Sequence, residues 1–268
     1  MTATLTTTDS SGIELLADPS ARERGLIVAC AGRRGGVSSP PFDTLNLSVS
    51  VGDDPAAAMT NRTRVAVAAG FEPAQLALAR QVHGAEIIEA DAGDCGVVGQ
   101  ADGLVARTPG VVLGILTADC APVLVESDEG VAVLHAGWRG LVGGVIEAGL
   151  TKLGGARRAW VGPSIRACCY EVGHDVTDAF ERAGLPLAGA RRVDVADGAR
   201  ATLERCGVRD VAVAPVCTCC GRAGSGDRDV GAYFSYRRDG LTGRQGSFIT
   251  LLKDAETRGG LDRTAESR

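Results

Sequence analysis

Apolar and polar residues alternate along the chain in blocks that predict several helices. The segment 53–70 predicts the first of them, because Asp54 suits the N-terminal cap, Pro55 suits the first turn, and Gly70 ends the pattern. Helical spacing returns at 139–155, where four apolar residues share one face: Val142, Ile146, Leu150 and Leu153. Two further helices are expected at 175–184 and 195–207.

Short apolar runs between these helices predict strands, several of them consecutive. They lie at 76–84, 85–90, 110–120, 121–127, 130–137, 158–164 and 210–217. Consecutive strands followed by helices favour an α/β, or mixed α+β, fold in which mixed sheets are covered by helices, and they argue against a strict doubly wound repeat. We expect one domain at 13–253, with polar, disordered ends at 1–12 and 254–268.

One apolar run, 114–125, carries Asp119 and Cys120 side by side in its middle. A buried thiol costs little, because it behaves as a small hydrophobic group. An unpaired buried carboxylate is expensive. The strand therefore ends at this point, or a neighbouring group compensates the charge.

Composition narrows the class of protein. Apolar residues make up 45% of the 268-residue chain and its formal charge is −5, which is typical of a globular protein and gives no footprint for nucleic acid or an anionic membrane. The first twelve residues lack the features of a signal peptide, and no apolar run is long enough to span a bilayer. We expect a cytoplasmic protein whose nine cysteines are reduced.

Three residues that could bind a metal each follow or close a predicted strand: His83, Cys120 and His135. Two imidazoles and one thiolate suit zinc with a fourth position left to water, and they also suit copper or a Cys–His nucleophile pair. The gaps of 37 and 15 residues match no short metal motif. On spacing alone, a buried thiol beside two hydrogen-bonded histidines is the simpler interpretation. The remaining histidine, His174, is expected to face solvent at the start of a helix.

A cysteine-rich run and two glycine- and arginine-rich segments are less specific indications of function. The run CTCC at 217–220 resembles a soft-metal cluster, but no partner pair lies at zinc-finger distance, so structural cysteines are the preferred interpretation. The segments 32–47 and 235–246 are rich in glycine and arginine, and arginine suits phosphate or carboxylate. Neither segment has the spacing of a phosphate-binding loop.

Several segments together resemble the multicopper polyphenol oxidase, or laccase-domain, family, also called YfiH-like and now linked to purine nucleoside phosphorylases. They are RRGGVSSPPFDTLNL, VGDDPAAAMTNR, QVHG, ADGLV, TADCAPVL, HAGWRG, GPSI followed by CCYEV, and SYRRDGLTGR, in order from about residue 25 to 252. The pair TADC and HAGWRG at this distance is highly specific. The resemblance implies a single YfiH-like domain of mixed sheets layered with helices.

The resemblance also implies a zinc site whose ligands, and catalytic residues, are His83, Cys120 and His135, with copper as the alternative metal. It connects the family both with copper-dependent phenol oxidation and with purine nucleosides: phosphorolysis of adenosine, inosine, guanosine and methylthioadenosine, and deamination of adenosine. A multicopper oxidase needs a histidine-rich trinuclear cluster, and three histidines cannot supply it. Oxidation at a single copper stays open. The residues present fit the purine reactions better than they fit multicopper oxidation.

Phosphorolysis requires positive donors near the cavity, to bind phosphate. The arginines of the matching segments are the candidates for substrate binding: Arg33, Arg62, Arg139, Arg237 and Arg244. Asn46 is a further polar candidate that could equally fix a turn. Arg166 stands where the family favours glycine and could change the charge at the rim of the site. Asp119 could orient a neighbouring ligand or an arginine.

The expected partners are therefore a purine nucleoside and phosphate, with neither nucleic acid nor membrane. Three other functions stay open at this point: a hydrolase that uses Cys120 as nucleophile, a copper-dependent phenol oxidase, and a metal-stabilised scaffold without catalysis. The sequence does not indicate the oligomeric state.

Overall fold

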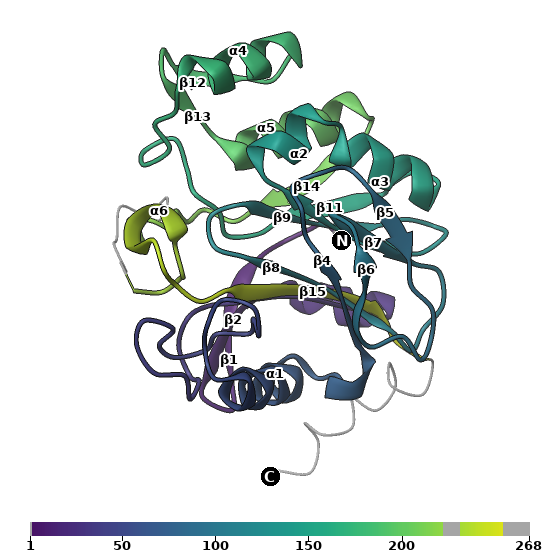
Figure 1. Cartoon of the computed structure of the whole chain (residues 1–268). Coiled ribbons are helices and arrows are strands. Elements are labelled where there is room, and N and C mark those ends of the chain that lie inside the picture. The colour runs from purple at the N-terminus through teal and green to yellow at the C-terminus, as the bar shows by residue number, and fades with distance from the viewer. Residues whose placement is uncertain (1, 222–230, 254–268) are drawn as a thin grey trace.

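The computed structural model describes residues 2–221 and 231–253, and in these residues two large β-sheets stack face to face (Figure 1). The first sheet has seven strands, in the order β1 (Thr6–Ser10), β2 (Ile13–Ala17), β3 (Leu26–Ala31), β15 (Gln245–Leu251), β8 (Val112–Thr117), β4 (Leu76–Arg80) and β6 (Gly96–Gln100). Most of its pairs are antiparallel, but β4 runs parallel to both β6 and β8. The sheet is therefore mixed.

The second sheet has six strands in the described residues. Their order is β14 (Asp210–Val213), β11 (Arg158–Val161), β9 (Ala121–Glu126), β10 (Val131–Ala136), β7 (Gly103–Ala106) and β5 (Ile87–Glu89). A separate small pair consists of β12 (Leu187–Gly189) and β13 (Arg192–Val193). Parallel pairing of β11 with β14 and of β5 with β7 makes this sheet mixed as well.

Helices cover the outer faces of both sheets, so the molecule has four layers (Figure 1). The long helix α1 (Pro55–Ala69) packs on the first sheet. Four helices lie on the side of the second sheet: α2 (Trp138–Val142), α3 (Val145–Leu153), α4 (His174–Arg182) and α5 (Val195–Arg205). The short helix α6 (Tyr236–Asp239) lies at one side, and 3-10 turns occupy Pro19–Arg24 and Pro73–Gln75.

Alternation along each central strand explains this layering. In β9, Leu124 belongs to the core between the two sheets, whereas Val123 and Val125 belong to the core under the helices. Trp160 of β11 and Ile115 of β8 are fully buried in the core between the sheets. Because neighbouring residues of a strand point to opposite faces, a strand with helices on one side and a sheet on the other is apolar throughout. This confirms the predicted class of mixed sheets layered with helices.

The predicted helices agree with the structure apart from one division. The Asp54 carboxylate accepts a hydrogen bond from the Ala56 N–H at 2.9 Å, and Gly70 ends α1 as expected. The helix predicted at 139–155 is divided into α2 and α3, because Gly144 has φ +82°, a conformation that interrupts a right-handed helix.

The N-terminal prediction was wrong for residues 2–12. Strand β1 pairs antiparallel with β2 through a two-residue turn, and the Ala3 N–H donates to the Asp210 carboxylate at 2.8 Å. Edge strands are commonly polar, so a threonine-rich segment such as Thr6–Ser10 forms an ordered strand here. The tail predicted to be disordered, 254–268, lies outside the described residues. No helix among the described residues has both the length and the apolar composition needed to cross a membrane.

Candidate active site and metal centre

The structure brings His83, Cys120 and His135 together from three separate segments. His83 follows β4 by three residues, Cys120 lies between β8 and β9, and His135 is the penultimate residue of β10. One potential ligand atom from each side chain lies within 4.8 Å of the other two. The Cys120 Sγ is 3.9 Å from the His83 Nε2, and the two imidazole ring centres are 4.8 Å apart. We call these three residues the His–Cys–His trio.

The strand that carries Asp119 does end there, at the point where the chain passes from one sheet to the other. Strand β8 of the first sheet stops at Thr117, and β9 of the second sheet starts at Ala121. The buried Asp119 has φ +101°, and its carboxylate accepts hydrogen bonds of 2.7 Å from the Thr218 hydroxyl and from the Arg237 backbone N–H. Asp119 thereby holds two other loops of the site in place.

Asp102, which is not among the site residues expected from the sequence, is the centre of the hydrogen bonds behind the trio. Its fully buried carboxylate accepts backbone N–H groups of Val82, His83 and Gly84, the last at 2.7 Å. It also accepts the His135 Nδ1–H at 2.8 Å. One side chain therefore sets both the loop that carries His83, where φ is +62°, and the orientation of the His135 ring.

Because the Nδ1 of His135 is engaged with Asp102, its Nε2 is the nitrogen that remains for Cys120 or a metal. Burial of Asp102 alone would raise its pKa, but the hydrogen bonds from His135 and the backbone lower it to about 2. Asp102 is therefore ionised at neutral pH.

The thiol of Cys120 is acidic in the metal-free protein. Burial alone would raise its pKa, but the charge and hydrogen bonding of His135, together with His83, lower the pKa to about 6. The same pairing raises the pKa of His135 to about 9 against the opposing effect of burial. A thiolate beside an imidazolium is a strong nucleophile, and the thiolate is also the form that binds metals.

Gly137 lets the trio approach closely. A Cβ atom added at this position would lie 3.0 Å from the Cys120 Sγ and 3.1 Å from the His83 Cδ2. The glycine of the HAGWRG segment therefore leaves room that any larger residue would take from the trio.

The trio faces a cavity of about 990 Å³, and four of the five predicted arginines line it: Arg62, Arg139, Arg237 and Arg244. Tyr170 and Trp138 line it too, with Arg237 stacked on Tyr170 and Arg139 on Trp138. Within the described part of the chain, none of these four arginines forms an ion pair with a carboxylate. Their charge is therefore available to an anion in the cavity.

Two arginines considered for the substrate site or its rim lie outside the cavity. Arg33 lines a smaller cavity and forms ion pairs with Asp43 and Asp239 at 2.9 and 3.3 Å. Arg166 is paired with Asp194 at 2.8 Å, so it adds no uncompensated charge to the rim.

Asn46 has the turn role that the sequence left open beside a contact with substrate. Its amide nitrogen donates to the Ser48 carbonyl and the Asp53 carboxylate, and its oxygen accepts the Ser48 and Arg244 N–H groups. This buried side chain fixes a turn and holds the backbone of Arg244, and it is not among the cavity-lining residues. The turn role explains its presence.

The donor set of the trio fits a metal. Two imidazole nitrogens and one thiolate, converging on an open cavity, are the ligands of catalytic zinc, which keeps one position for water or substrate. These residues could also bind copper. The three side chains can therefore hold a metal ion.

Asp102 could have been noticed in the sequence, since an acidic residue directly before the apolar run 103–106 is as unusual as Asp119 in its own run. Gln81 gave no such signal. Its amide pairs with the backbone of Leu116 in both directions, at 2.8 and 3.0 Å, and so fixes the start of the His83 loop against the end of β8.

Comparison with known proteins agrees with this geometry. The sequence profile of the family described as "Multi-copper polyphenol oxidoreductase laccase" matches residues 27–252. A protein of Streptomyces coelicolor named purine nucleoside phosphorylase is 40% identical over 82% of this chain and 93% of its own. Escherichia coli YfiH, also named purine nucleoside phosphorylase, is 36% identical over 84% of this chain and 94% of its own.

Solved structures show the same fold. The crystal structure of YlmD from Geobacillus stearothermophilus superposes with a TM-score of 0.81 at 30% identity, covering 92% of this chain and 99% of that one. The YfiH protein of Bacillus licheniformis gives a TM-score of 0.76 at 26% identity, covering 91% and 98%. The resemblance identified from the sequence is thereby confirmed.

Proposed function

The chain belongs to the multi-copper polyphenol oxidoreductase laccase family, and from that premise we propose that it is a zinc-dependent purine nucleoside phosphorylase. The proposed substrates are adenosine, inosine, guanosine and methylthioadenosine. The names of the relatives from Streptomyces and Escherichia support the reaction class. The chain's three histidines do not suffice for a trinuclear copper cluster, which argues against laccase chemistry.

The observation that carries the proposal is the presence, among the arginines that line the cavity, of four with no ion pair to a carboxylate of the described residues: Arg62, Arg139, Arg237 and Arg244. Phosphate is a dianion near neutral pH, and guanidinium groups bind it through paired hydrogen bonds. A cavity of about 990 Å³ is large enough for a nucleoside together with phosphate. Tyr170 and Trp138 provide aromatic faces against which a purine could stack.

In phosphorolysis, an oxygen of phosphate forms a bond to C1′ of the ribose while the bond between C1′ and the base nitrogen breaks. The base leaves with the electron pair and takes up a proton, and ribose 1-phosphate is the other product. The arginines would hold the phosphate and stabilise negative charge, and the cavity walls would orient the sugar toward it.

His83, Cys120 and His135 would hold the zinc ion, with Asp102 keeping the His135 ring in place. When bound, zinc would act as a Lewis acid and lower the pKa of a water molecule toward neutrality. Deamination of adenosine, in which water replaces the purine amino group and ammonia leaves, is the second reaction that we propose for this site. The residues that take part in this reaction would again be His83, Cys120 and His135.

The test is release of base from adenosine and inosine, with and without phosphate, measured by chromatography. Phosphate-dependent adenine or hypoxanthine with ribose 1-phosphate would support phosphorolysis, and phosphate-independent inosine from adenosine would support deamination. We expect Arg139→Gln to lower kcat/KM for phosphate by roughly 10- to 100-fold, the effect of one charge-assisted hydrogen bond. The control is Arg33→Gln, an arginine already paired with carboxylates, which should change kcat/KM little.

A cysteine hydrolase is the second candidate, favoured by the lowered pKa of Cys120 and its contact with His83. In that reaction the thiolate would attack a carbonyl carbon and His135 would return a proton to the leaving group. This function predicts inactivation by iodoacetamide and no loss of activity with chelators. Chelator-sensitive activity that zinc restores would exclude it.

A further inference from the structure

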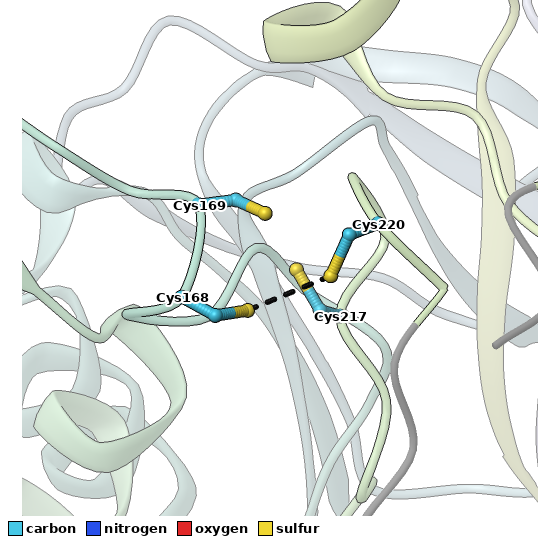
Figure 2. Close-up of side chains that lie close together, drawn as sticks. All are labelled: Cys168, Cys169, Cys217 and Cys220. Atoms are coloured by element: carbon cyan, nitrogen blue, oxygen red, sulfur yellow. Dashed lines mark hydrogen bonds between the residues drawn. The ribbon is translucent and has the colours of Figure 1, made fainter. Parts of the chain in front are cut away.

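Four cysteines outside the His–Cys–His trio meet at one point, on two loops that are far apart in the sequence (Figure 2). One loop follows β11 and the other follows β14, and β11 and β14 are neighbours in the second sheet. All four sulfur atoms lie within 4.8 Å of one another. We propose that they form a second metal site, which binds one structural zinc ion through the thiolates of Cys168, Cys169, Cys217 and Cys220.

The spacing of the sulfur atoms is that of a tetrahedral thiolate site. A Zn–S bond is about 2.3 Å, so two sulfurs of a tetrahedral site lie about 3.8 Å apart. The Cys168 Sγ and the Cys220 Sγ are 3.6 Å apart in the structure. The other sulfur pairs lie within 4.8 Å of each other, so no pair has to approach by more than about 1 Å to reach the tetrahedral spacing. Rotation of a cysteine side chain can supply this movement. Four sulfur donors would close the site to water, as in structural zinc sites.

The local sequence provides half of a familiar motif. Cys217 and Cys220 are separated by two residues, the C-x2-C spacing of zinc knuckles and ribbons. The Gly221 N–H donates to the Cys217 carbonyl at 2.9 Å and so closes a tight turn, while the Arg166 N–H donates to the Cys217 Sγ at 3.4 Å. Hydrogen bonds from backbone N–H groups to sulfur stabilise a thiolate.

The two loops are already aligned without a metal. Ser164 and Cys217 form an isolated parallel β-bridge, and the Thr218 N–H donates to the Ser164 carbonyl at 3.0 Å. A metal would therefore bind to a largely preformed set of sulfurs, and little conformational entropy would be lost on binding.

Nearby positive charge suits the proposed ion. Four thiolates and one Zn²⁺ carry a net charge of about −2. Three guanidinium groups contact the backbone of the same loops: Arg192 donates to the Cys168 carbonyl at 3.0 Å, Arg237 to the Cys169 carbonyl at 3.2 Å, and Arg238 to the Cys219 carbonyl at 3.1 Å. Arg238 is also paired with Asp239 at 2.7 Å, so the charge that would offset the thiolates comes from Arg192 and Arg237.

The alternative is a pair of disulfides. No disulfide joins the cysteines of the described residues. The neighbours Cys168 and Cys169 are consecutive in the chain, which disfavours a bond between them, so oxidation would have to join each to a cysteine of the other loop. A zinc ion holds its four sulfurs about 3.8 Å apart, close to the 3.6 Å between the Cys168 Sγ and the Cys220 Sγ, whereas a disulfide needs about 2 Å. This favours the metal.

The proposed site would brace one wall of the active-site cavity. Tyr170 follows Cys169 directly, and Arg237 both stacks on Tyr170 and donates to the Cys169 carbonyl. Both side chains line the cavity. A metal that fixes the loop containing Cys168 and Cys169 would therefore hold Tyr170 and Arg237 in position. This inference does not depend on the reaction proposed above.

The experiment measures zinc per chain by mass spectrometry of the purified full-length protein. A variant without the trio, His83→Ala with Cys120→Ala, should retain about one zinc ion, because the four-cysteine site is untouched. A variant with Cys217→Ser and Cys220→Ser should lose one zinc ion relative to the wild type. Cys95→Ser and Cys206→Ser, exposed cysteines outside both sites, are the matched controls and should leave the zinc content unchanged.

Cobalt gives a second readout that does not depend on activity. Cobalt bound by four thiolates gives an intense thiolate-to-metal charge-transfer band, and in the trio-deficient variant this band should appear and should weaken with Cys168→Ser. Cys168 is exposed, so its replacement should leave the fold intact even if the double serine variant does not fold. Cys219→Ser, next to the site but not part of it, should keep the full band.

Two results would overturn the proposal. One is a trio-deficient variant that binds neither zinc nor cobalt. The other is peptide mapping of air-exposed, zinc-replete protein that finds these cysteines joined as disulfides. Failure of the trio to bind zinc would instead leave about one zinc ion per wild-type chain, so failure of the proposed function and failure of this site are distinguishable.

Discussion

Replacement of Asp102 by asparagine should weaken both the fold and the metal centre. The carboxylate accepts hydrogen bonds from four N–H donors, three of the backbone and one of His135, and it is fully buried. Asparagine has nearly the same shape but replaces one acceptor oxygen with an NH₂ group. Since every partner is an N–H donor, at least one buried donor would face another donor.

The magnitude follows from the ionisation of Asp102. A tenfold change in an ionisation constant corresponds to about 1.4 kcal/mol, so a pKa lowered to about 2 means that the folded protein favours the ionised form by roughly 2–3 kcal/mol. This stability is fully present above the pKa of the unfolded chain, about 4, and is lost as pH falls through about 2. We therefore expect Asp102→Asn to lower the free energy of unfolding at pH 7 by roughly 2–3 kcal/mol, or Tm by roughly 5–10 °C.

The assay combines thermal unfolding with zinc affinity. Because Asp102 orients His135, zinc affinity of the trio should fall by about 10- to 100-fold. The matched control is Asp18→Asn, a buried carboxylate that accepts hydrogen bonds from Ser20 and Trp160 and does not touch the trio. It should lower Tm and leave zinc affinity unchanged. Equal zinc affinities for the two variants would refute the positioning role of Asp102, and an unchanged Tm would refute the energetic argument.

Three further predictions concern the same site. Gly137→Ala should lower zinc affinity and activity while the chain still folds, because the added methyl group would crowd Cys120 and His83. Zinc titration measures the affinity and circular dichroism measures folding. An affinity equal to that of the wild type would contradict the prediction. In metal-free protein, alkylation of Cys120 by iodoacetamide should reach half its maximal rate near pH 6, whereas the buried Cys30, with a pKa of about 12, should stay unmodified. Peptide mass spectrometry measures both rates, and a midpoint above pH 8 for Cys120 would contradict the lowered pKa. Asp119→Asn should lower the free energy of unfolding by no more than about 1 kcal/mol, because the Thr218 hydroxyl can accept a hydrogen bond as well as donate one. Asp119→Ala should lower it by roughly 2–3 kcal/mol. Denaturant unfolding measures both, and equal losses would contradict this account.

The elements that local sequence specifies were predictable. Helix α1 has its cap, first-turn proline and terminal glycine in sequence, and its bounds agree with the prediction. The strands at 112–117, 121–126 and 131–136 were visible as apolar runs because both of their faces are buried. Strand β1 was not, because the edge strand Thr6–Ser10 consists only of polar residues and so resembles a loop.

The site was only partly predictable for a different reason. The gaps between His83, Cys120 and His135 contain whole strands, so their meeting point depends on how the sheets stack, which spacing does not encode. The family resemblance provided the trio, not the geometry. The cysteines at 168–169 and 217–220 are likewise brought together by the parallel pairing of β11 with β14, across 48 residues of chain from Cys169 to Cys217.

The crossing of the chain between the sheets links ligand binding to folding. His83 leaves a strand of the first sheet, His135 lies within the second, and Cys120 is on the connection between them. A metal that binds all three therefore binds only when the two sheets are docked, and at a free concentration 100 times its Kd it would stabilise that state by about 2.7 kcal/mol. Loss of the ion would remove this stabilisation from the docked sheets, and we expect faster amide hydrogen exchange in β8 and β9, the two strands that flank Cys120.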